Sequence, residues 1–188
     1  EKWGDATFSA SLSADILASD INDSEGIVTL RDFDMTSSTD TCNIHQLQLR
    51  TGYDHQGHYL VMESDFGYAM LTGQFNYSSL ATSITSQLGR HIPILAPTVT
   101  KQTGDNNFTL IAYLNSTDWM KPLLGIPLNI LQPIQLRSSV EDSHNSLVVQ
   151  CMAPRFTYND KTFTAANLSL QSTADSLVCS TGVVKHQD

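Results

Sequence analysis

The chain has 188 residues, of which 40% are hydrophobic and 15% charged. This length is typical of one domain, and the abundance of Ser and Thr beside apolar residues favours two-faced strands over a solvated helical bundle. The formal net charge is −9 and the ten Lys and Arg residues are scattered, which argues against nucleic-acid binding. No run approaches the roughly 18 apolar residues that a membrane-spanning helix needs.

Alternation of apolar and polar residues dominates the first part of the chain. From residue 6 to residue 17, Phe8, Leu12 and Ile16 fall on one face and Ser and Thr on the other. This pattern predicts a strand of about a dozen residues. The same alternation predicts four further strands, at 26–35, 42–51, 58–66 and 68–79.

The period then changes from two to nearly four. Leu80, Ile84 and Leu88 recur at helical spacing behind serine residues, and Gly89 follows them. The sequence therefore predicts an amphipathic helix near 78–90.

Alternation resumes after this helix. Residues 107–115 predict a strand, and 117–124 predict a short helix with Pro122 in its first turns. Residues 127–140 and the remainder of the chain predict about four more strands. Because the connections are short, consecutive strands are expected to pair antiparallel in a meander of some nine strands.

Residues that could support catalysis are sparse. His55 and His58 have the spacing of a metal pair, but Gly52 and Gly57 bracket them, so a polar hairpin loop is the preferred interpretation. The chain has no GxSxG elbow, P-loop or GxGxxG motif. We therefore predict a protein that is not an enzyme, without catalytic, cofactor-binding or metal-binding residues.

The three cysteines, Cys42, Cys151 and Cys179, are widely separated and lie in strand-like contexts. An odd count with this spacing does not indicate a disulfide framework or a zinc knuckle. Buried free thiols are the preferred interpretation. A bridge between Cys151 and Cys179 is the alternative.

Several strands carry bulky apolar residues on both faces, as in ILQPIQL, SLVVQCM and YLVM. A half-solvated sheet would instead alternate strictly. Two-sided strands either pack in a sandwich, bend around a core or line an apolar surface.

The chain resembles the periplasmic β-repeat region of the AsmA-like, TamB-type translocation and assembly module family, particularly its Bacteroidetes members. One set of matching residues forms the recurring strand pattern GxVxLxDF: Gly26, Val28, Leu30, Asp32 and Phe33. A second set lies in the later half of the chain: Asn107, Phe108, Asp118, Trp119, Ile126, Pro127, Leu128, Pro133, Asp142, Asn145, Ala153, Pro154, Phe156, Tyr158, Asp175 and Leu177.

The resemblance implies a mainly β fold, a long antiparallel meander sheet curled into a half-pipe (β-taco-like) groove with one or two short helices. Residues 1–188 would form a single β-rich segment of a longer protein that is anchored in the inner membrane outside this segment and crosses the periplasm. Its implied function is lipid transport, moving phospholipid between the inner and outer membranes, or outer-membrane protein assembly with a barrel partner. The helix near 78–90 interrupts the family's plain meander and is expected to cap or plug the groove.

Phospholipid acyl chains are then the expected ligand. The candidate residues of the apolar interior are Phe8, Leu12, Ile16, Phe75, Leu110, Leu114, Ile134, Leu136, Val149, Phe156, Leu168 and Leu170. The alternative function is a cell-surface β-sandwich that binds glycan or a partner protein, with Trp3, Tyr53, Tyr59 or Trp119 as stacking residues. An enzyme that uses His55 or His58 is a third hypothesis.

Overall fold

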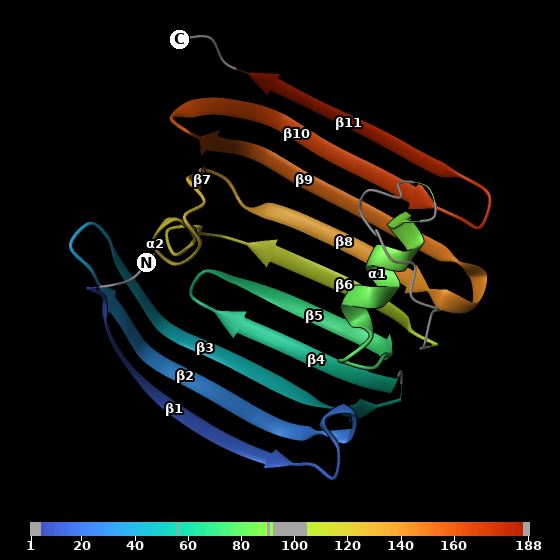
Figure 1. Ribbon diagram of the computed structural model, residues 1–188, viewed down its shortest axis with the longest axis horizontal. Helices are drawn as coiled ribbons and strands as arrows, with labels where there is room; N and C mark the ends of the chain where they lie inside the picture. The colour runs from blue at the N-terminus through green and yellow to red at the C-terminus, as the bar shows by residue number, and fades with distance from the viewer. Residues whose placement is uncertain (1–4, 56, 90, 92–104, 186–188) are drawn as a thin grey trace.

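One open antiparallel sheet makes up most of the protein, which we describe from a computed structural model covering residues 5–55, 57–89, 91 and 105–185 (Figure 1). Ten strands follow one another in the order β1-β2-β3-β4-β5-β6-β8-β9-β10-β11, and β7 lies off this path, paired with β9. Every pairing is antiparallel. The predicted meander is therefore confirmed.

The strands are long and are joined mostly by tight turns. Before α1 they are β1 (Thr7–Leu17), β2 (Glu25–Thr36), β3 (Thr41–Asp54), β4 (Gly57–Ser64) and β5 (Gly67–Gln74). After it they are β6 (Asn107–Leu114), β7 (Leu128–Ile130), β8 (Ile134–Glu141), β9 (Ser146–Tyr158), β10 (Lys161–Ser172) and β11 (Leu177–Lys185).

Within the part of the chain that the structure describes, two α-helices interrupt the meander: α1 (Leu80–Gly89) after β5 and α2 (Met120–Leu124) after β6. Two short 3-10 turns, η1 (Ile21–Asp23) and η3 (Asp142–His144), join β1 to β2 and β8 to β9. Neither α-helix described has the length and apolar character required to cross a bilayer.

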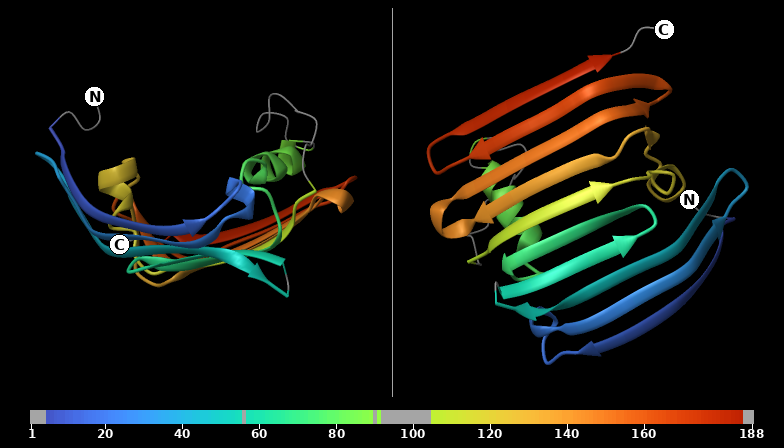
Figure 2. Two further views of the ribbon diagram at one scale, coloured as in Figure 1. Left: turned by 90° about the horizontal axis from the view of Figure 1, so that it is seen from below. Right: turned by 180° about the vertical axis from the view of Figure 1, so that it is seen from behind.

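The sheet is curved along its strands, and α1 and α2 lie over its concave face near opposite ends of those strands (Figure 2). Each helix covers one buried cluster. Beneath α1 lies the first cluster: Leu71, Phe75, Phe108, Val140 and Leu147. Beneath α2 lies the second, Met35, Cys42 and Ile44, against which Trp119 and Leu123 pack. Neither of the two described α-helices covers the concave face between the two clusters.

The structure differs from the sequence prediction in two respects. The described residues form eleven strands rather than some nine, in part because a bend at 131–133, which ends in Pro133, divides the expected 127–140 stretch into β7 and β8. The second helix begins at Met120 rather than Thr117, since Thr117 is held in the loop by its side chain. The described residues form one sheet, as predicted, and not the two packed sheets of the alternative sandwich.

Thr117 fixes β7 in place and supports a first prediction. Its buried hydroxyl donates to the Leu128 carbonyl at 2.7 Å and accepts from the Ile130 amide at 3.1 Å. Thr117→Val keeps the side-chain shape but removes both bonds, so we expect a loss of about 2 kcal/mol in the free energy of unfolding. Urea unfolding measures this loss, and Thr109→Val, at an exposed position of β6, is the matched control. Equal losses in the two variants would show that the two hydrogen bonds of the Thr117 hydroxyl do not stabilise the fold.

Candidate functional site

A continuous row of small and apolar side chains crosses the concave face from β1 to β11. Residues directly opposite each other on antiparallel strands project from the same face, so the register defines the row. We call this row the apolar floor: Ala14, Val28, Leu49, Met62, Ala69, Ala112, Leu136, Cys151, Leu168 and Thr181. None of the ten side chains is buried. The floor is thus apolar yet accessible.

The rows on either side of the floor extend its apolar character. Towards α1 the next row is Ile16, Gly26, Thr51, Leu60, Leu71, Leu110, Ser138, Val149, Leu170 and Cys179. Towards α2 it begins Leu12, Leu30, Leu47, Ser64, Gly67, Leu114 and Ile134. The concave face therefore presents a broad apolar band that runs across the strands.

The convex face has a different composition at the same position along the strands. Its corresponding row is Ser13, Thr29, Gln48, Glu63, Tyr68, Tyr113, Gln135, Met152 and Asn167. Here the Glu63 carboxylate pairs with Arg50, 3.7 Å away. A mixed polar surface of this kind is ordinary solvent-facing sheet, and it identifies the concave face as the unusual one.

A buried polar network holds α1 to one end of the concave face. The Asp142 carboxylate accepts hydrogen bonds from the Ser83 hydroxyl at 2.8 Å, from the backbone N–H of Asn106 at 3.1 Å and from the Gln87 side-chain amide at 3.4 Å. Asp142, Ser83, Asn106 and Gln87 are all buried. Because buried polar groups are costly unless paired, this network fixes the position of the helix strongly.

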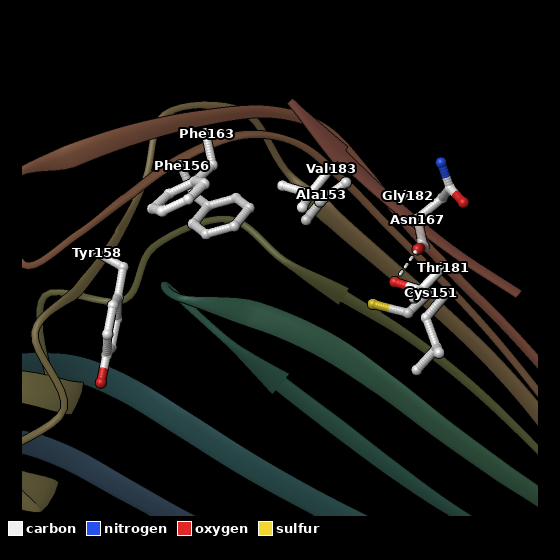
Figure 3. A pocket seen from close by; sticks show the side chains of 11 residues that line it. Cys151, Ala153, Phe156, Tyr158, Phe163, Asn167, Thr181, Gly182 and Val183 are labelled. Atoms are coloured by element: carbon white, nitrogen blue, oxygen red, sulfur yellow. Dashed lines mark hydrogen bonds between the residues drawn. The ribbon is translucent and has the colours of Figure 1, made fainter. Parts of the chain in front are cut away.

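A hollow in the concave face lies over β9, β10 and β11. It is a cavity of about 360 Å³ lined by Cys151, Ala153, Phe156, Tyr158, Phe163, Ala166, Asn167, Leu168, Thr181, Gly182 and Val183 (Figure 3). Phe156 and Phe163 stack there with ring centroids 5.3 Å apart. The lining is almost wholly apolar, as expected for a surface that contacts hydrocarbon.

All twelve residues predicted for the apolar interior lie on the concave side. Leu136 and Leu168 belong to the floor, and Phe156 lines the cavity with Leu168. Phe75 is 8% exposed and belongs to the cluster under α1, so most of its side chain packs in the core rather than on the apolar floor. Whether the other eleven contact a ligand stays a prediction.

Sequence reasoning left out most of the floor itself. Ala69 and Ala112 face each other at its centre, and Met62 and Leu49 continue it. The alternation within each strand was visible in the sequence, but only the cross-strand register shows that these small side chains align into one row.

The cysteines are free but not uniformly buried, which corrects the expectation of buried thiols. Cys42 is buried, Cys151 is half-buried on the floor and Cys179 is exposed. Burial raises the pKa of the Cys42 and Cys151 thiols, so both stay protonated near neutral pH. The alternative Cys151–Cys179 bridge is absent because β10 separates their strands.

His55 lies in the turn of the β3–β4 hairpin, as predicted, whereas His58 points into the structure. The His58 ring stacks between Tyr53 and Phe75, with centroids 4.7 and 4.4 Å away. Its Nε2 lies 2.9 Å from the Thr51 hydroxyl. Gly73, directly opposite His58, has φ of +128°, and a Cβ there would lie 2.3 Å from the Asn107 carbonyl oxygen.

Within the described residues no three His, Cys, Asp or Glu side chains are grouped to hold a metal ion.

His58 also supports a pH prediction. Burial lowers its pKa below the usual 6.5, an effect opposed in part by the Ser24 carbonyl and by the charges of Asp23 and Glu25. The folded protein therefore favours the neutral imidazole, and this contribution to stability is complete above pH 6.5 and is lost as pH falls through the lowered pKa. We expect the free energy of unfolding to decrease more steeply between pH 7 and 5 in the native chain than in His58→Gln. Parallel pH profiles from urea unfolding would contradict this assignment.

Comparison with known proteins does not place the chain in a family. No protein-family model, curated protein or solved structure matches it.

Proposed function

We propose that this chain is a periplasmic segment of an AsmA/TamB-like protein whose concave face forms a half-pipe groove for phospholipid acyl chains. In this proposal the parent protein is anchored in the inner membrane and carries lipid towards the outer membrane, or assists outer-membrane protein assembly with a barrel partner. The observation that carries the proposal is the accessible apolar floor, which crosses the ten paired strands between α1 and α2.

The physical argument rests on continuity. Each methylene group moved from water to an apolar surface gains about 0.8 kcal/mol, so an acyl chain can lie on the floor at many equivalent positions. Small side chains such as Ala69 and Ala112 leave room for a chain where the sheet curves. No catalytic group is needed for such transfer, and the proposed protein is not an enzyme.

The alternative cell-surface glycan or protein-binding module has less support. Trp119 packs against Phe66, with ring centroids 5.1 Å apart, and against the cluster beneath α2. Tyr59 is half-buried, and Trp3 lies outside the described residues. Of the proposed stacking residues, Tyr53 is the exposed aromatic ring that remains.

Native mass spectrometry tests the proposed function directly. The chain would be expressed with export to the periplasm of a bacterial host, purified without detergent and sprayed under non-denaturing conditions. We expect adducts with the mass of phospholipid that disappear after organic extraction. Consistent recovery of lipid-free protein, together with no binding when phospholipid is added back, would refute the proposal.

A further inference from the structure

A second cavity, of about 640 Å³, lies where η1 meets the β3–β4 hairpin and the end of β5. Its lining is both aromatic and acidic, whereas the lining of the cavity over β9 to β11 is almost wholly apolar. The residues that matter for its chemistry are Asn22, Asp23, Tyr53, Asp54, His58 and Phe75.

The aromatic side of this cavity is a stack of three rings. His58 lies nearly parallel to Tyr53 and to Phe75, with interplanar angles of 15° and 16°. Tyr53 ends the stack and is 48% exposed. Its hydroxyl donates to the Asn22 carbonyl at 3.0 Å and to the Asp23 carboxylate at 3.4 Å, which ties the ring to η1. The exposed ring is thus held beside a carboxylate.

The charge of the cavity is negative. Asp23 and Asp54 line it, and none of its described lining residues is Lys or Arg. The lowered pKa of His58 keeps that imidazole neutral, so it does not offset the carboxylates. The buried His58 Nδ1 has no hydrogen-bond partner. The face of an electron-rich ring and the nearby carboxylates both attract a cation. Alkyl groups on that cation add to the attraction, because they and the ring face exclude water from each other.

We propose that this cavity binds an alkylammonium group, which contacts the Tyr53 ring and is neutralised by Asp23. The group would be either the headgroup of a zwitterionic phospholipid or a free amine such as choline. The assignment rests on this cavity alone and does not require the lipid-transport function.

Choline titration followed by NMR of the folded chain provides the test. We expect saturable shifts of the residues around Tyr53. The neutral isostere 3,3-dimethylbutan-1-ol, which has the same shape without the charge, should bind at least about ten-fold more weakly if charge drives recognition. Equal binding of the two probes, or no binding of choline, would overturn the proposal.

Variants separate the ring from the charge. Tyr53→Leu removes the ring face and should abolish saturable binding, whereas Tyr53→Phe retains the ring and should weaken binding only by about three-fold. Asp23→Asn keeps an acceptor for the Tyr53 hydroxyl but removes the charge, so we expect roughly five-fold weaker binding. Asp15→Asn, an exposed carboxylate on β1, is the matched charge control and should bind choline as the native chain does. Equal loss in Asp15→Asn and Asp23→Asn would refute the site.

Short-chain lipids below their micelle concentration distinguish the two sources of the ammonium group. Dihexanoyl phosphatidylcholine that binds more tightly than choline, with no shift at Tyr53 from dihexanoyl phosphatidylglycerol, would identify a lipid headgroup. Equal binding of phosphatidylcholine and choline would identify a free amine. Shifts on the apolar floor from both lipids, with none at Tyr53, would overturn this inference and leave the proposed lipid groove supported.

Discussion

Asp142→Ala is expected to lower the free energy of unfolding by roughly 3 to 5 kcal/mol, the largest stability change that we predict for a single residue. The substitution leaves three buried donors, from Ser83, Asn106 and Gln87, without their acceptor. Water cannot reach these donors while α1 remains in place. Either α1 separates from the end of the sheet or the donors stay without hydrogen bonds, and both outcomes destabilise the fold. Urea unfolding followed by far-ultraviolet circular dichroism measures the change.

Two comparisons test whether the buried network is the cause. Asp142→Asn keeps one acceptor oxygen for Ser83 and for the Asn106 amide, and should lose less than half as much stability as Asp142→Ala. Asp15→Ala, an exposed position on β1, should change stability by less than about 0.5 kcal/mol. An Asp142→Ala variant as stable as Asp15→Ala would show that α1 is not held by this carboxylate.

The fold was largely predictable because its determinants are local. The period-two alternation in residues 6–17 and 107–115 marks strands directly, and Leu80, Ile84 and Leu88 mark α1 by their spacing. Short connections then require antiparallel neighbours. These signals need no information about contacts between distant residues.

The features that give the concave face its detail depend on contacts far apart in sequence. Ser83 and Asp142 are 59 positions apart, so nothing near either residue indicates their bond. Asp32 has φ of +48°, a left-handed conformation within β2 that changes which residues face inward beyond it. As a result Leu30 and Phe33, three residues apart, both contribute to the concave side.

The candidate site was predicted only in outline for the same reason. Bulky residues such as Leu110 and Leu136 were identified because apolar side chains at alternate positions stand out. Ala69 and Ala112 did not, since small residues carry little signal until the register aligns them. The cavity beside Tyr53 was missed because His58 had been assigned to a polar loop, although the structure buries it within an aromatic stack.

Leu136→Glu is expected to have the largest effect on the proposed function. Leu136 lies on the floor between Ala112 and Cys151, and its half-buried side chain would contact a bound acyl chain. A carboxylate there would lose water when hydrocarbon covers it, which costs several kcal/mol without a partner. We therefore expect the affinity for a fluorescent long-chain phospholipid analogue to fall at least ten-fold, equivalent to about 1.4 kcal/mol or more.

Gln135→Glu is the matched control for this experiment. Gln135 precedes Leu136 on β8 but faces the convex side, opposite Tyr113 and Met152, and is exposed. The control adds the same charge to the same strand, so a general effect of net charge on a chain already at −9 would weaken both variants equally. If the concave face has a specific role, Gln135→Glu should bind the analogue as the native chain does. Leu136→Met should retain the affinity within about two-fold. Circular dichroism should show that Leu136→Glu remains folded. Equal loss from the two glutamate variants would place the lipid elsewhere and remove the main support for the groove.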